Sequence, residues 1–127
     1  MPSKPVAKND KRRALGKEGE DAGAIWLESR GMRVLERNFR CRMGEIDIVG
    51  EIDGMTVIVE ARGRSSDKWG TAAESIDYEK RRKLKMLAAY YMCLRGKADE
   101  AYRIDVLSMR YGEDGRPCQF QWFQNAI

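Results

Sequence analysis

The chain has 127 residues, 43% of them hydrophobic, and a net charge of +4, which suit one domain with a single core and a polyanionic partner. It contains no histidine, so serine–histidine triads and histidine zinc sites are excluded, and any catalysis must use carboxylates, basic side chains or a metal ion. Three widely spaced cysteines, Cys41, Cys93 and Cys118, argue against a disulfide framework and a zinc knuckle.

The start of the chain is polar and includes two prolines, which predicts a flexible tail over residues 1–9 and a single domain over residues 10–127. No apolar run approaches the roughly 20 residues that a membrane-spanning helix needs, and MPSKPVAKND lacks the apolar core of a signal peptide. We therefore expect a cytoplasmic protein with no membrane partner.

The first half of the domain has the pattern of a helix followed by three strands. Apolar residues at helical spacing predict a helix over roughly residues 10–30, and Gly31 is suited to end it. Imperfect alternation predicts a strand over 32–41. The step Asp53–Gly54 between two alternating runs then predicts a β-hairpin with strands over 44–50 and 55–62.

The second half has the pattern of a helix followed by two strands. The helix begins either at Thr71, which has capping-box spacing, or at Asp77, and it ends near Arg95. Strands over 102–110 and 117–123 follow, joined by a turn at 112–115. The order α-β-β-β-α-β-β predicts an α/β protein with a central sheet and helices packed against it.

The hairpin carries charge where a buried strand is expected. Pairing about its turn places Asp47 opposite Glu60 and Glu45 opposite Arg62. Two opposed carboxylates repel unless one is protonated, a cation of the protein lies between them, or a metal ion does. A solvated face with four salt-bridged side chains stays open. The apolar run TVIVEA around Glu60 favours instead a Mg²⁺ or Mn²⁺ site, with the carbonyl of Ala61 nearby.

Basic residues gather in two clusters, each of which is either a solvated surface or a phosphate-binding surface. The first cluster comprises Arg30, Arg33, Arg37, Arg40 and Arg42, and the second comprises Lys80, Arg81, Arg82, Lys83 and Lys85. Lys80 and Arg81 continue the apolar stripe of the second helix backwards, so the beginning of that helix is expected to project past the core. The candidates for contacts with nucleic-acid phosphates are Arg64, Lys80, Arg81 and Lys83.

Longer stretches of the chain resemble a known family. They are GKEGEDAGAIWL at 16–27, GMRVLERNFRCRMGEIDIVG at 31–50, VIVEARGR at 57–64, RIDVLSM at 103–109 and FQNAI at 123–127. Together they are similar to the YraN-like family of small bacterial proteins, within the PD-(D/E)xK or restriction-endonuclease-like nuclease superfamily that includes Holliday-junction resolvases. The resemblance implies a restriction-endonuclease-like αβββαβ core with an extra C-terminal strand, and cleavage of structured or branched DNA with Mg²⁺ or Mn²⁺.

The resemblance also implies roles for particular residues. Asp47, Glu60 and the carbonyl of Ala61 would hold the metal, and Glu20 would lie beside them as an accessory carboxylate. Arg62 stands where the superfamily usually has lysine. Because arginine stays charged at physiological pH, Arg62 cannot be the general base, although it can hold the scissile phosphate and stabilise charge that develops on it.

Several interpretations stay open beside that one. A nucleic-acid-binding module with a degenerate site and a protein-interaction subunit both fit the sequence, and a two-fold dimer would suit a substrate with two strands to cut. An ion pair with Lys17 would also account for Glu20. We interpret Asp105 as structural. Trp26 and Trp122 are interpreted as packing residues, whereas Trp69 is a candidate for stacking on bases.

Overall fold

A computed structural model describes residues 16–64 and 76–127 of the chain. Its elements, in chain order, are α1 (Gly16–Ser29), β1 (Arg33–Cys41), β2 (Gly44–Ile52), β3 (Met55–Arg64), α2 (Tyr78–Leu94), β4 (Tyr102–Tyr111) and β5 (Pro117–Phe123). The strands form one sheet in the order β1-β2-β3-β4-β5. Since β3 and β4 are parallel and the other neighbours antiparallel, the sheet is mixed, and the predicted α/β class with an αβββαβ order and an extra C-terminal strand is confirmed.

The helix ends follow local capping chemistry. Gly31 has φ of 103°, a left-handed conformation that favours glycine, and it lies just after α1. The side chain of Asp77 accepts a hydrogen bond from the backbone N–H of Lys80 at 2.9 Å, so the later of the two predicted starts of α2 is confirmed. Thr71, the predicted tail over 1–9 and the predicted beginning of the first helix at 10–15 lie outside the described residues.

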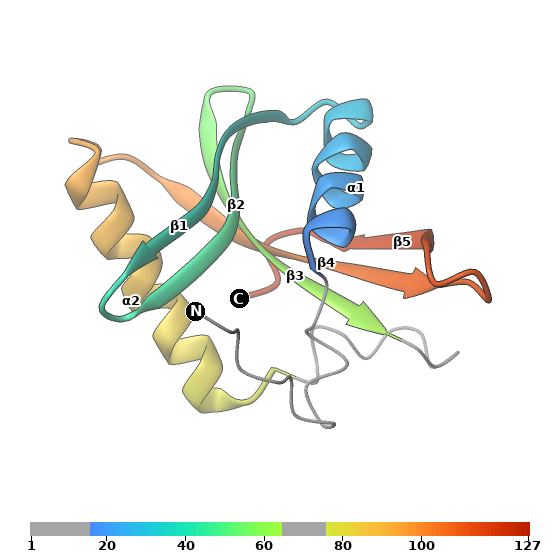
Figure 1. The fold of residues 1–127 in the computed structure, drawn as a ribbon. Coiled ribbons are helices and arrows are strands. Elements are labelled where there is room, and N and C mark those ends of the chain that lie inside the picture. The colour runs from blue at the N-terminus through green and yellow to red at the C-terminus, as the bar shows by residue number, and fades with distance from the viewer. Residues whose placement is uncertain (1–15, 65–75) are drawn as a thin grey trace, which may run out of the picture.

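Two apolar layers lie on opposite faces of the sheet, each covered by one helix (Figure 1). α2 packs Leu84, Leu87 and Tyr91 against Ile58 and Val106. On the other face, α1 contributes Ala24 and Leu27, which lie with the β3 and β4 side chains Val57, Val59, Ala61, Leu107 and Met109. β3 is therefore buried from both faces, which explains its nearly continuous apolar sequence. Neither described helix is long and apolar enough to cross a membrane.

β2 and β3 pair near the hairpin turn and then separate. Their antiparallel register runs from Ile52–Met55 to Ile48–Val59, as the sequence predicted. Beyond Ile48, β2 continues along β1, whereas β3 continues along β4. Figure 1 shows the turn between β1 and β2 lying beside α2, while the end of β3 points away from it. The prediction that the ladder continues, with Asp47 facing Glu60 directly, was therefore wrong.

The separation also divides the apolar face that the sequence predicted for this hairpin. Ile46 packs in the layer under α2, whereas Ala61 packs in the layer under α1. The expected opposition of Glu45 and Arg62 is wrong for the same reason, and the ion pair of Glu45 is with Arg40 of β1, at 3.5 Å. Twist and curvature of a strand pair are not visible in an alternating pattern of residues, so the sequence alone could not reveal where the strands part.

Candidate metal centre

A polar pocket of about 580 Å³ opens where β2 and β3 separate. Side chains from both helices and from β1, β2 and β3 meet there, and its lining residues are Gly16, Glu20, Arg40, Cys41, Gly44, Glu45, Asp47, Glu60, Ala61, Lys80, Lys83 and Leu87. The pocket therefore brings together Glu20, Asp47, Glu60, Ala61, Lys80 and Lys83 of the residues that the sequence analysis proposed.

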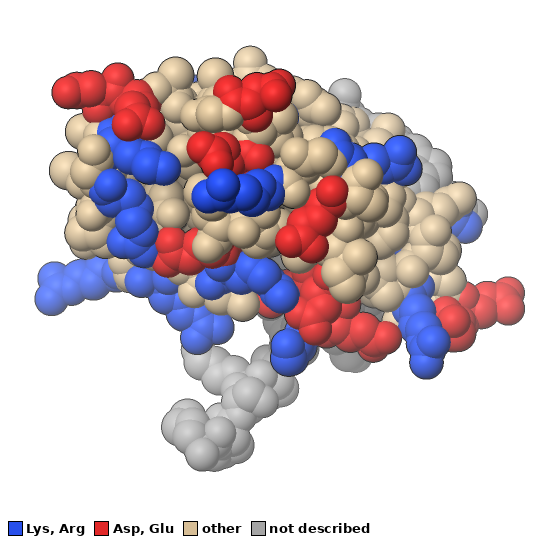
Figure 2. Space-filling model, turned by 90° about the horizontal axis from the view of Figure 1, so that it is seen from above, with Lys and Arg blue, Asp and Glu red and all other residues tan. Residues whose placement is uncertain are grey.

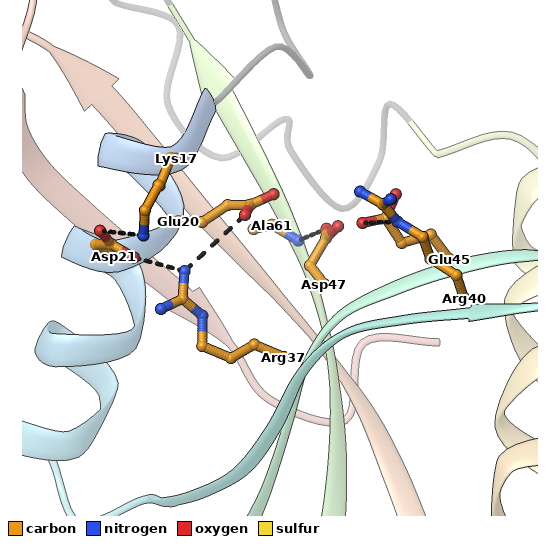
Figure 3. Close-up of polar contacts among 8 residues, drawn as sticks. All are labelled: Lys17, Glu20, Asp21, Arg37, Arg40, Glu45, Asp47 and Ala61. Carbon is orange, nitrogen blue, oxygen red and sulfur yellow. Dashed lines mark hydrogen bonds and ion pairs between the residues drawn. The ribbon is translucent and has the colours of Figure 1, made fainter.

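Asp47 lies at the centre of this pocket. Its half-buried carboxylate accepts a hydrogen bond from the backbone N–H of Ala61 at 2.9 Å, across the gap between the two strands (Figure 3). Burial is the main cause that raises the pKa of Asp47 to about 7. The nearby charge of Glu60 raises it further, as do those of Glu45 and Glu20, while the hydrogen bond from Ala61 acts in the opposite direction.

Three carboxylates come close enough to share one ion. One oxygen each from Glu20, Glu45 and Asp47 lie within 4.8 Å of one another. Figure 3 shows Glu20 reaching from α1 toward Asp47 on β2. The sequence analysis gave Glu45 only an ion-pairing role, yet Glu45 and Asp47 are two residues apart on β2, a spacing that places both side chains on one face of a strand.

Asn38 of β1 is a further residue that the sequence analysis missed. It adopts a left-handed backbone conformation, with φ of 56°, which is uncommon for a residue other than glycine. With its side-chain amide oriented to donate, the nitrogen lies 3.1 Å from Glu45 and 3.2 Å from Glu20. Asn38 can therefore hold these two carboxylates in place, and asparagine is among the residues that tolerate this conformation best.

Glu60 is buried, with 4% of its surface exposed, and it points to cations rather than into the three-carboxylate group. Its Oε2 lies 3.5 Å from Nζ of Lys80 and 4.0 Å from Nε of Arg62. Lys80 was predicted as a phosphate contact, and the structure brings its amine from the first turn of α2 into the pocket. A lysine thus enters the site from the helix, while β3 carries an arginine.

The other predicted phosphate contacts lie in different surroundings. Lys83 is exposed and lines the pocket. Arg81 donates to the carbonyl oxygens of Ile76 and Ala126 at 3.1 and 3.2 Å, so it tethers the C-terminus to α2. Arg64 ends β3, in register with Arg110 of β4.

The first basic cluster is largely neutralised by neighbouring acids. Arg33, Arg37 and Arg40 lie within 4.0 Å of the carboxylates of Glu51, Asp21 and Glu45, respectively. Figure 2 shows acidic and basic side chains interspersed over the face seen from above. These contacts favour the interpretation of this cluster as solvated surface.

The alternative partner predicted for Glu20 is also corrected by the structure. Lys17 pairs with Asp21 at 3.3 Å, one turn further along α1, while Glu20 lies 3.9 Å from Arg37 of β1 (Figure 3). An ion pair with Lys17 therefore does not account for Glu20. The i, i+4 spacing competes with i, i+3 on a helix surface, and here the former prevails.

Asp105 on β4 has the structural role that the sequence suggested. It is fully buried, and it accepts hydrogen bonds from Arg103 at 3.0 Å, from Nε1 of Trp122 at 2.8 Å and from the backbone N–H of Asn125 at 2.7 Å. Trp26 packs against Phe120, with ring centroids 5.2 Å apart. Trp69 lies outside the described residues.

Fold and pocket define a mixed α/β protein with a carboxylate-rich centre at the parting of two strands. The chain belongs to the uncharacterised protein family UPF0102, whose model matches residues 19–109, and the predicted membership of the YraN-like family is confirmed. A UPF0102 protein of Pelotomaculum thermopropionicum is 39% identical over 93% of this chain and 98% of its own. One of Moorella thermoacetica is 48% identical over 77% of this chain and 82% of its own.

A third relative covers nearly the whole chain. The UPF0102 protein MCA0184 of Methylococcus capsulatus is 40% identical over 91% of this chain and 92% of its own. Among solved structures, SfsA of Pyrococcus furiosus in complex with Ca²⁺ matches 84% of this chain and 60% of its own, at 13% identity and a TM-score of 0.36, a likeness too low to bear on the fold.

Proposed function

We propose that this protein is a metal-dependent endonuclease that hydrolyses phosphodiester bonds in structured or branched DNA. The observation that carries the proposal is the environment of Asp47. Its carboxylate is held across the strand gap by Ala61, lies close to two other carboxylates, and has a pKa raised to about 7. In these surroundings the ionised form of a carboxylate is destabilised unless a cation lies beside it, and the protonated form is otherwise favoured.

The side chains present fit a hard divalent cation. Asp47, Glu20 and Glu45 offer carboxylate oxygens from α1 and β2, and Mg²⁺ and Mn²⁺ prefer such oxygen ligands. Bound there, Mg²⁺ or Mn²⁺ supplies positive charge that makes a water molecule more acidic and neutralises phosphate oxygens. Glu60 and Ala61 line the same pocket, and although the carboxylate of Glu60 pairs with Lys80 and Arg62, we include it and the carbonyl of Ala61 in the proposed ligand set.

The two cations beside Glu60 have separate proposed roles. Arg62 stays charged at physiological pH, so it binds the scissile phosphate and stabilises the negative charge that develops there. Lys80 places an ammonium 3.5 Å from Oε2 of Glu60, and lysine amines are suited to proton exchange in a way that guanidinium groups are not. Lys83, which also lines the pocket, binds a neighbouring phosphate.

The arginine at position 62 also favours a second candidate function. If that arginine cannot replace lysine, the protein is a non-catalytic nucleic-acid-binding module with the same pocket and the same cations. A module of this kind would bind DNA in a strongly salt-dependent manner and leave the phosphodiester bonds intact.

Cleavage assays with branched, single-stranded and duplex DNA, in Mg²⁺ or in Mn²⁺, separate these functions. Asp47→Asn is expected to lower the cleavage rate by about 100-fold or more, since it removes a metal ligand while keeping an acceptor for Ala61. Glu51→Gln is the matched control, because Glu51 is a partly exposed acid of the same strand that pairs with Arg33 outside the pocket. It should leave cleavage unchanged.

Two outcomes would contradict the proposal. If the wild-type protein bound DNA in a salt-dependent manner without cleaving it, the result would contradict the nuclease and support the binding module. If the protein failed to bind any of these DNA substrates at low salt, the result would contradict both functions and support a protein-interaction subunit.

A further inference from the structure

One side of α2 exposes two aromatic side chains with a basic and an apolar side chain between them. Tyr78, Arg82, Met86 and Tyr90 follow at steps of four residues, so they lie along one side of the helix. Tyr78 is 74% exposed, Met86 47% and Tyr90 41%, although these are large side chains that a helix usually buries. The packed side of α2 is carried by other residues, among them Leu84 and Leu87, although the ring of Tyr90 lies near the core residue Phe39.

A groove of about 470 Å³ connects this stripe to the candidate metal centre. Its lining residues are Arg42, Met43, Asp77, Glu79, Lys80, Arg82, Lys83 and Met86. Lys80 and Lys83 line both the groove and the pocket that holds Asp47, so the two lie next to each other.

The groove is positively charged. Four of its side chains are cationic and two are acidic. Asp77 caps α2 by accepting a hydrogen bond from the backbone N–H of Lys80, and Glu79 forms an ion pair with Arg82 at 3.7 Å. The groove therefore keeps a net positive charge, and since Lys80 also pairs with Glu60 at 3.5 Å, Arg42 and Lys83 are the cations best placed to contact a chain of phosphates.

We propose that the α2 stripe binds a single-stranded segment of nucleic acid that leads into the metal centre. This inference rests on the proposed function, and it names the substrate class as DNA with an unpaired strand beside the scissile bond. Tyrosine rings stack on the faces of unpaired bases, whereas a duplex hides those faces within its own stack. Lys and Arg side chains between the rings contact the backbone.

The dimensions of the stripe suit several nucleotides. Tyr78 and Tyr90 are twelve residues apart, which corresponds to about 18 Å along a helix. The ring of Tyr90 is supported on its inner side by Phe39, with centroids 6.5 Å apart, so it offers a partly fixed platform. A protein partner is less well matched, because lysine is depleted in the centres of protein–protein interfaces and three lysines, Lys80, Lys83 and Lys85, lie along this part of α2.

Fluorescence anisotropy with labelled oligonucleotides tests the proposal. The full chain carrying Asp47→Asn is used in EDTA, so that cleavage cannot affect binding. Adding Tyr78→Ala and Tyr90→Ala together should weaken binding of a twelve-nucleotide oligothymidine by about tenfold or more, and binding of a blunt duplex of equal length by less than about twofold. Tyr78→Phe should bind like the parent because it retains the ring.

Ile25→Ala is the matched control, since Ile25 is an exposed apolar residue of α1, on the other face of the sheet. It should leave both affinities unchanged. Equal losses for single strand and duplex, or no loss for either, would overturn the proposal, as would a parent protein that binds duplex but not the single strand. Metal-dependent cleavage is measured separately with the wild type, so the failure of catalysis and the failure of this binding surface are distinguishable.

Discussion

Ala61 on β3 donates its backbone N–H to the carboxylate of Asp47 on β2, and this 2.9 Å hydrogen bond spans the place where the two strands part. A side chain thus takes the position that a strand carbonyl would occupy in a continuous ladder. The same carboxylate lies near Glu20, Glu45 and Glu60, so the bond that joins the strands also holds a negative charge among other negative charges. From this arrangement we expect a folding stability that depends on pH and on divalent cations.

Without a metal ion, the folding stability should fall as the pH rises. The pKa of Asp47 is raised from 3.8 to about 7, so between these values the native protein binds more protons than the unfolded chain. The contribution of Asp47 to stability is therefore largest below about pH 4, and it is lost above about pH 7, on the order of a few kcal/mol. Urea unfolding in EDTA between pH 4.5 and pH 8 measures this slope.

The same measurement on Asp47→Asn supplies the test. Asparagine keeps an oxygen for Ala61 and carries no charge, so the slope should become shallower and the variant should be more stable than the wild type at pH 8. Glu51→Gln should retain the wild-type slope. An unchanged slope in Asp47→Asn would show that another group causes the pH dependence.

Binding of Mn²⁺ should stabilise the protein more at pH 8 than at pH 6. The ion must displace the proton from Asp47, whose pKa is about 7, and the proton is bound most of the time at pH 6. We expect the midpoint of thermal unfolding to rise with Mn²⁺ concentration, and the rise to be small in Asp47→Asn. A shift of equal size at both pH values, or in both proteins, would place the ion elsewhere.

Lys80→Met should destabilise the protein and impair cleavage, because it leaves the buried carboxylate of Glu60 with Arg62 as its nearby cation. The expected cost is about 1–3 kcal/mol, typical of losing a charged partner at a mostly buried site. In a double-mutant cycle with Glu60→Gln, the combined cost should be smaller than the sum of the single costs. Strict additivity would mean that Lys80 and Glu60 do not interact, and Lys83→Met, from the same helix, is the matched control for stability.

Asp105→Ala should destabilise the protein without altering DNA binding by the folded fraction. The change leaves Arg103 without its carboxylate and removes the acceptor of Trp122 and Asn125, so we expect a loss of about 3 kcal/mol or more. Trp122→Phe removes one of these hydrogen bonds and should cost about 1 kcal/mol. Weaker binding at unchanged stability would instead assign Asp105 to the binding surface.

Local patterns predicted the elements and half of the hairpin. The turn at Asp53–Gly54 fixed the register of β2 and β3 as far as Ile48 and Val59, and Asp77 marked the start of α2. Such signals depend on neighbours in the sequence. The place where β2 and β3 separate depends on the pairing of β2 with β1 and of β3 with β4. This is a tertiary effect that no local sequence pattern predicts.

The candidate site was predictable to a similar extent. Asp47 and Glu60 were found because charge interrupts apolar strands, whereas the place of Glu20 came from the family resemblance. The basic start of α2 was expected to project past the core, yet nothing in the sequence identified Glu60 as the partner of Lys80. Asn38 was missed because its effect on Glu20 and Glu45 depends on a backbone conformation that spacing does not reveal.

The side chain at position 47 also has a structural role that does not depend on catalysis, because it accepts the hydrogen bond from the backbone N–H of Ala61. If a member of the family lost the proposed activity, it would still need an oxygen there, and Asn would serve the main chain as well as Asp. Among the described residues, Glu20 and Glu45 accept no such main-chain hydrogen bond, and each lies near an arginine instead. Under the proposed function, carboxylates at positions 20 and 45 would therefore indicate an active enzyme better than the residue at position 47.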